Sequence, residues 1–193
     1  MPYEIINTVA AVGTFLVIAA TAIAAVIQLR HMRVNNQLEG LLSVLARVED
    51  PSFNRWMTEA KQQLPAMLAD PAYRRSIMED TYDREVSWLF LGNSYDWVGS
   101  LVKNRLIPED ALMDVYGFRV IRAWDALSDV LAILRRTRGP GIWENFEYLY
   151  TRANAWWERN RDGGLPKSFK RVKIEDPWLL DDLAFIEKPQ TLT

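Results

Sequence analysis

The uncharged run from Ile5 to Leu29 is the feature that most constrains the fold of this chain, and it reads IINTVAAVGTFLVIAATAIAAVIQL. An α-helix rises about 1.5 Å per residue, so a helix over this run can cross a hydrocarbon core of about 30 Å. A helix also satisfies its own backbone N–H and C=O groups, which lipid cannot do. The run therefore predicts a transmembrane anchor over residues 1–30.

Two other interpretations of the run are weaker. A cleaved signal peptide has a basic segment before its apolar core, whereas the first four residues here, MPYE, contain neither Lys nor Arg. Small residues near Ala22–Ala25 still leave a cleavage site open. A buried core helix of a soluble protein seldom runs this long without a charge. The membrane span is therefore the favoured interpretation.

The flanks of the run predict its orientation. Arg30 and Arg33 follow it, with His31 between them, whereas Glu4 precedes it. Cationic flanks tend to stay in the cytoplasm, so we expect the N-terminus outside and the rest of the chain inside. The absence of cysteine is compatible with a reducing compartment.

Composition limits what the rest of the chain can be. About 160 residues remain after the run, enough for one domain with a hydrophobic core. The whole chain has 23 basic and 25 acidic residues, a balance that argues against a nucleic-acid partner. No segment alternates with a period of two, so we predict an all-α fold, with an N-terminal transmembrane helix followed by a small multi-helix bundle.

Proline and glycine mark the expected boundaries. Asp50-Pro51 and Asp70-Pro71 are typical helix starts, and Pro65 is expected to end or bend the helix between them. The apolar spacing predicts a further helix over 80–104, with a kink at Gly92 left open, and another over 142–160. Between them, residues 107–110 are typical of a helix start, and the helix is expected to close at Arg135–Arg138, with an interruption at Gly117 left open. The predicted domains are an anchor (1–30), a juxtamembrane helix (31–50), a helical domain (51–162) and a C-terminal tail (163–193).

A coiled-coil-like stripe follows the span. It consists of Val34, Leu38, Leu41, Leu45 and Val48. The stripe is about two heptads long, so we favour packing on the chain's own domain over a dimer seam. The dimer stays open because the span contains pairs of small residues four apart, which let two helices approach closely. These pairs are Ala20 with Ala24 and Thr21 with Ala25.

Two longer segments carry a family resemblance. They are LVKNRLIPEDALMDVYGFRVIRAWDAL and RRTRGPGIWENFEYLYTRANAWW, within residues 101–157, and the opening AAVGTFLVIAATAIAAVIQLR adds to them. The chain resembles an uncharacterised bacterial family catalogued only as a domain of unknown function. Its members are small and often have one N-terminal span and a helical C-terminal part. The resemblance implies the anchor and the all-α fold, and it brings no activity or catalytic residue.

Catalytic and metal-binding signatures are weak. His31 is the only histidine and there is no cysteine, so a zinc site and a conventional nucleophile with its base have no support. A carboxylate site would have to use Asp80 and Asp83, expected on one helical face, together with Glu144 and Glu147. Solvated faces or pairing with arginine are the simpler interpretation. We therefore predict no enzyme activity, no cofactor and no metal site.

The last predicted helix carries the candidate partner contacts. Trp156 and Trp157 point in different directions, so at least one is expected to be exposed or covered by the tail. With Arg152 and Arg159 nearby, they are possible contacts for a protein partner, although core packing is the simpler interpretation. In the tail, Lys167, Lys170, Arg171 and Lys173 are compatible with either an anionic inner leaflet or a solvated linker.

Three functional hypotheses follow. The favoured one is a membrane-anchored helical interaction or scaffold module of a bacterial inner membrane, whose partners are the lipid bilayer and a protein or a second copy. The second is a membrane-perturbing effector or stress protein that acts through oligomerisation of the span. The third is a carboxylate-dependent hydrolase that needs Asp80, Asp83, Glu144 and Glu147 to converge in one cleft.

Overall fold

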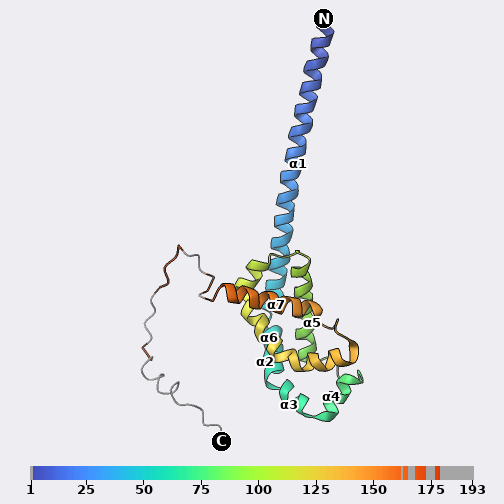
Figure 1. Cartoon of the computed structure of the whole chain (residues 1–193), viewed down its shortest axis with the longest axis vertical. Coiled ribbons are helices and arrows are strands. Elements are labelled where there is room, and N and C mark those ends of the chain that lie inside the picture. The colour runs from blue at the N-terminus through green and yellow to red at the C-terminus, as the bar shows by residue number, and fades with distance from the viewer. Residues whose placement is uncertain (1, 162, 165–167, 173–176, 179–193) are drawn as a thin grey trace. The chain divides into compact units, whose positions relative to one another are not determined.

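The computed structural model describes residues 2–161, 163–164, 168–172 and 177–178. Over this part of the chain it is all-α (Figure 1), which confirms the predicted fold class: a long apolar N-terminal helix followed by a packed bundle. Residues 1–161 form one compact unit and residues 162–193 a second. The first unit contains α1 (Pro2–Val48), α2 (Pro51–Gln62), α3 (Leu64–Ala69), α4 (Pro71–Met78), α5 (Ser87–Lys103), α6 (Glu109–Arg138) and α7 (Glu144–Arg159).

Helix α1 runs without a break through the apolar segment and into the bundle. Its last turns are part of the core, with Val44 and Val48 buried and Leu41 and Leu45 packed against the core. Val34, at the other end of the predicted stripe, is exposed. The favoured expectation, that the stripe packs on the chain's own domain, is therefore confirmed for its last three members, whereas Val34 and Leu38 face outward.

The two Asp-Pro pairs start helices as predicted. The Asp50 carboxylate accepts a hydrogen bond from the Ser52 backbone N–H at 2.7 Å, at the start of α2. Asp70 does the same for the Ala72 N–H at 2.8 Å, at the start of α4. Each side chain satisfies one of the N–H groups that lack an intrahelical partner. Helix α2 ends at Gln62, before Pro65, and Pro65 lies in the first turn of α3.

The helix predicted over 80–104 is wrong at its start, because α5 begins at Ser87. Asp80 has a left-handed backbone, with a φ of 63°. The Asp83 carboxylate accepts from the Glu85 backbone N–H at 2.8 Å, a local hydrogen bond that competes with helix formation. Asp80 and Asp83 therefore lie in a connection and do not share a helical face. From Ser87 onward α5 is unbroken through Gly92.

The last two helices are close to the prediction. Helix α6 continues through Gly117 and ends at Arg138, and the next residue, Gly139, has a φ of 92°, a backbone conformation that suits glycine. Helix α7 begins at Glu144, two residues later than expected, because Trp143 adopts a left-handed backbone with a φ of 51°. Tyr95 of α5 stacks on Phe146 of α7 with 5.0 Å between ring centroids, at the centre of the core.

Candidate functional site

The first feature with functional meaning is the exposed apolar part of α1. Within the described residues, α1 is the one helix that is long and apolar enough to cross a membrane, judged by length and composition. None of its most apolar 18-residue window is buried, so this segment is not the core of the bundle. That finding contradicts the buried-core interpretation of the run. A signal sequence passes the same test of length and composition.

The predicted partner contacts on α7 separate into buried and exposed residues. Trp156 is buried, so it belongs to the core. Trp157 is 45% exposed, and its ring centroid lies 5.7 Å from that of Phe118 on α6, which is also exposed. Val115 lies one turn before Phe118 and is exposed as well. We call Val115, Phe118 and Trp157 the aromatic surface.

The two predicted arginine contacts differ in their surroundings. Arg159 is exposed at the end of α7. Arg152 is held by Glu109, with 2.7 Å between Nη2 and Oε1, and the hydrogen bond and charge of Glu109 raise the pKa of Arg152. This pair joins α7 to the start of α6. Sequence patterns do not single out Val115 and Phe118, because α6 is apolar on more than one face.

Three of the four carboxylates of the hydrolase hypothesis have separate cationic partners, and the fourth, Asp83, accepts from the Glu85 backbone N–H. Glu144 pairs with Lys103 at 3.1 Å, and Glu147 pairs with Arg135 at 2.6 Å. Asp80 pairs with both Arg84 and Arg138. Nowhere in the described part of the chain do three His, Asp or Glu side chains gather closely enough to hold a metal ion. The four carboxylates therefore do not form the single cleft that this hypothesis requires.

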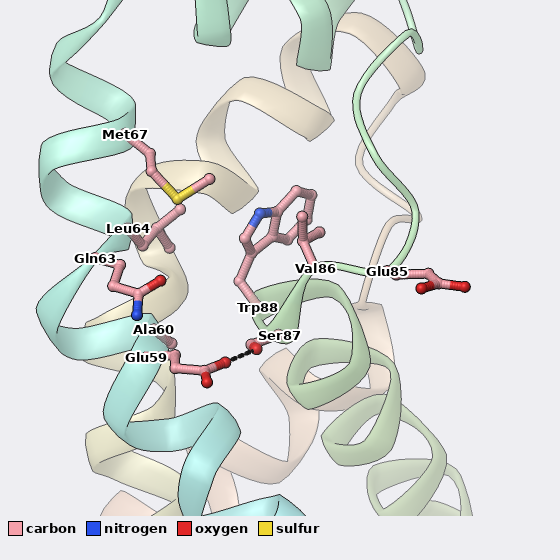
Figure 2. Close-up of a pocket in the computed structure, with 9 residues that line it drawn as sticks. All are labelled: Glu59, Ala60, Gln63, Leu64, Met67, Glu85, Val86, Ser87 and Trp88. Atoms are coloured by element: carbon pink, nitrogen blue, oxygen red, sulfur yellow. Dashed lines mark hydrogen bonds between the residues drawn. The ribbon is translucent and has the colours of Figure 1, made fainter.

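A pocket of about 230 Å³ lies between α2, α3 and the start of α5 (Figure 2). One wall is polar, where the Ser87 hydroxyl donates to the Glu59 carboxylate. The other is apolar and is formed by residues including Leu64, Met67 and Trp88. The first N–H groups of α5 have no intrahelical partners, so the Glu59 charge stabilises this helix end. Glu59 therefore has a structural role at the start of α5.

Two further pockets are lined by cations. One, of about 260 Å³ between α2 and α6, includes Lys61 and Arg122. The other, of about 450 Å³, lies beside α1 just after its apolar run and includes Arg33 and Arg105. Sequence patterns do not predict the second pocket, because Arg33 and Arg105 are far apart in the chain and only the tertiary fold brings them together.

These features define a class of protein, a helical bundle carried on a long, exposed, apolar N-terminal helix. The profile of the family described as "Domain of unknown function (DUF4760)" matches residues 15–153. The chain belongs to this family, which confirms the resemblance seen in the sequence. The match includes most of the apolar run as well as the bundle. No curated protein and no solved structure matches the chain.

Proposed function

We propose that the chain is a membrane-anchored helical interaction module, in which α1 spans the bilayer and the bundle presents a binding surface beside it. One observation carries the proposal: a single helix contains both an exposed apolar run and, from Leu41 onward, residues packed in the bundle core. The anchor and the bundle are therefore joined without a flexible linker. Tethering at a membrane raises the effective concentration of the bundle toward other membrane components.

The proposed location is a bacterial inner membrane, with the N-terminus outside and the bundle in the cytoplasm. Arg30 and Arg33 support this orientation, because they flank the bundle end of the run and the opposite flank carries Glu4.

The aromatic surface is the proposed contact for a protein partner or a second copy. Trp157 and Phe118 together offer a rigid apolar patch of the kind that dominates protein interfaces. Arg159, exposed at the end of the same helix as Trp157, adds a cation at its edge. Trp156 is not part of this proposal because it is buried.

Cysteine labelling tests the anchor and its orientation, since the natural chain has no cysteine. Tyr3→Cys and Ala72→Cys each place one thiol on an exposed residue, on either side of the apolar run. In bacterial spheroplasts, a membrane-impermeant maleimide should label the first variant directly and the second only after lysis. The reverse pattern would overturn the orientation. A soluble product that has lost residue 3 would overturn the anchor.

Crosslinking in intact cells tests the interaction. A photoreactive side chain at Phe118 or Trp157 should give a defined crosslinked band, either to another protein or to a second copy. The same group at Arg75, exposed on α4, is the matched control and should give none. Equal crosslinking from all three positions, or none from any, would overturn the assignment of the aromatic surface.

A further inference from the structure

The pocket beside α1 is concave and positively charged. Its walls come from α1, from the end of α5 and the connection that follows it, and from α7. The cations that line it are Arg33, Lys103, Arg105 and Arg152, and the lining carboxylate is Glu109. The Gln37 side-chain amide donates to the Arg105 carbonyl at 3.2 Å, so the connection is held against α1. The geometry brings cations from three helices around a volume of about 450 Å³.

Two of these cations are compensated and two are not. Arg152 pairs with Glu109 at 2.7 Å, and Lys103 pairs with Glu144 at 3.1 Å. The side chains of Arg33 and Arg105 are exposed and have no ion pair or hydrogen bond with any described residue. The pocket therefore has an excess of positive charge that an anion can neutralise. Guanidinium groups bind phosphate oxygens with paired N–H donors, which favours a phosphate over a simple halide.

The backbone conformation of Arg105 is a second, independent observation in favour of a role for this residue at the pocket. Its φ is 57°, in the left-handed region that costs a residue with a Cβ about 1–2 kcal/mol. The Leu106 N–H bonds to the Leu101 carbonyl, and the Arg105 N–H bonds to the Val102 carbonyl, both at 2.9 Å. This is a Schellman motif, and Arg105 occupies the position that glycine normally fills. An arginine here costs stability and places a guanidinium beside the pocket.

One side of the pocket lies at the depth of the headgroup layer of a bilayer. Arg33 follows Leu29 by four positions, about 6 Å along the helix axis, and Gln37 follows by eight, about 12 Å. The headgroup layer extends about 5–8 Å beyond each side of the hydrocarbon core. Leu106, next to Arg105, is 55% exposed and offers an apolar contact at the same end of the bundle. Arg33 therefore lies within the headgroup layer, and Gln37, which holds the Arg105 connection, lies about 4 Å beyond it on the bundle side.

We propose that this pocket binds the phosphate of an anionic phospholipid headgroup, with Arg33 and Arg105 as its principal ligands. The inference rests on the proposed function, because the pocket reaches the headgroup layer only if α1 spans the bilayer. Lipid binding would fix the bundle against the membrane surface and orient the aromatic surface. Basic pockets beside membrane helices on the cytoplasmic side are known sites for anionic headgroups.

The test uses the full chain reconstituted in nanodiscs that contain phosphatidylcholine and phosphatidylglycerol in equal amounts. Native mass spectrometry then measures which lipid is retained when the disc is stripped. The natural chain should retain phosphatidylglycerol preferentially. The double variant Arg33→Gln/Arg105→Gln should reduce this preference about fivefold for each cation lost. The matched control Lys61→Gln/Arg122→Gln removes two cations from the pocket between α2 and α6, and it should retain the preference for phosphatidylglycerol.

The outcomes separate this inference from the anchor. Reconstitution with no preference for phosphatidylglycerol, or an equal loss in both double variants, would overturn the lipid site and leave the anchor intact. Failure of the natural chain to associate with either lipid would overturn the anchor itself. If millimolar inorganic phosphate displaced the retained lipid completely, the pocket would be a site for a soluble phosphate, and the lipid assignment would be overturned.

The variant Arg105→Gly distinguishes a ligand role of Arg105 from a purely structural role. Glycine suits the left-handed backbone, so this variant should unfold at a higher temperature than the natural chain while losing part of its lipid preference. A purely structural role for Arg105 would leave the lipid preference unchanged. That result would overturn its assignment as a ligand.

Discussion

The backbone of Gly92 lies directly against the indole of Trp143. A Cβ atom at residue 92 would be 2.1 Å from Cζ2 of that ring, well inside the distance that two carbon atoms tolerate. Trp143 cannot easily retreat, because its Nε1 donates to the Asn93 side chain at 2.9 Å and the ring packs on Trp88. The absence of a side chain at Gly92 therefore lets the Trp143 ring, just before α7, pack directly against α5.

Gly92→Ala should destabilise the bundle by about 1–3 kcal/mol, the usual cost of forcing an extra methyl group into a packed core. Gly117→Ala is the matched control, since its Cβ would meet only Met113, with 3.7 Å to the nearest atom. Alanine is the better helix former, so the control should gain about 0.5–1 kcal/mol. Urea unfolding of the full chain in detergent, followed by tryptophan fluorescence, measures both. Equal effects of the two substitutions would contradict the contact.

Asp96 holds the first turn of α7 from outside that helix. One carboxylate oxygen accepts the backbone N–H groups of Asn145 at 2.9 Å and Phe146 at 3.1 Å. Asp96→Ala leaves both donors without their partner and should cost about 1–3 kcal/mol of unfolding free energy. Asp96→Asn retains an acceptor oxygen and should recover part of that loss. Asp114→Ala, at an exposed site on α6, should change stability by less than about 0.5 kcal/mol.

Tyr95 should make the bundle sensitive to alkali. Burial raises the pKa of its phenol above the ordinary value of about 10. The unfolded chain loses this proton above pH 10 while the folded chain retains it, so its contribution to stability is complete below that pH. Above it, unfolding free energy should fall by up to about 1.4 kcal/mol per pH unit. Tyr95→Phe keeps the stack on Phe146 and should reduce this slope. An unchanged slope in denaturation curves measured between pH 9 and 11 would contradict the assignment.

Local sequence determined some parts of this structure, and those parts could be predicted. The caps at Asp50 and Asp70 involve a donor two residues away, so the dipeptide itself predicts them. The late start of α5 has a local cause as well, since the Asp83 carboxylate accepts from the Glu85 N–H, but the contact of Asp80 with Arg138 of α6 could not be predicted in this way. Tertiary contacts override apolar spacing there.

The candidate sites also combine features that local sequence predicts with features that depend on tertiary contacts. The apolar run and the exposure of one of the two adjacent tryptophans follow from composition and helical geometry. The pairing of Phe118 with Trp157 depends on how α6 and α7 pack, which spacing alone does not specify. The cationic pocket depends on three helices, and its key residue, Arg105, occupies a backbone position for which sequence patterns predict glycine.

The packing of the end of α1 in the bundle can be tested by making the same Val→Ala substitution at two positions of this helix. Val44 is fully buried, whereas Val34 is 61% exposed. Val44→Ala removes two methyl groups from the core and leaves a cavity, so it should cost about 1–3 kcal/mol. Val34→Ala should change unfolding free energy by less than about 0.5 kcal/mol. Unfolding in detergent micelles measures both, and equal values would show that α1 is not part of the bundle core, so that the anchor holds the bundle only as a tether.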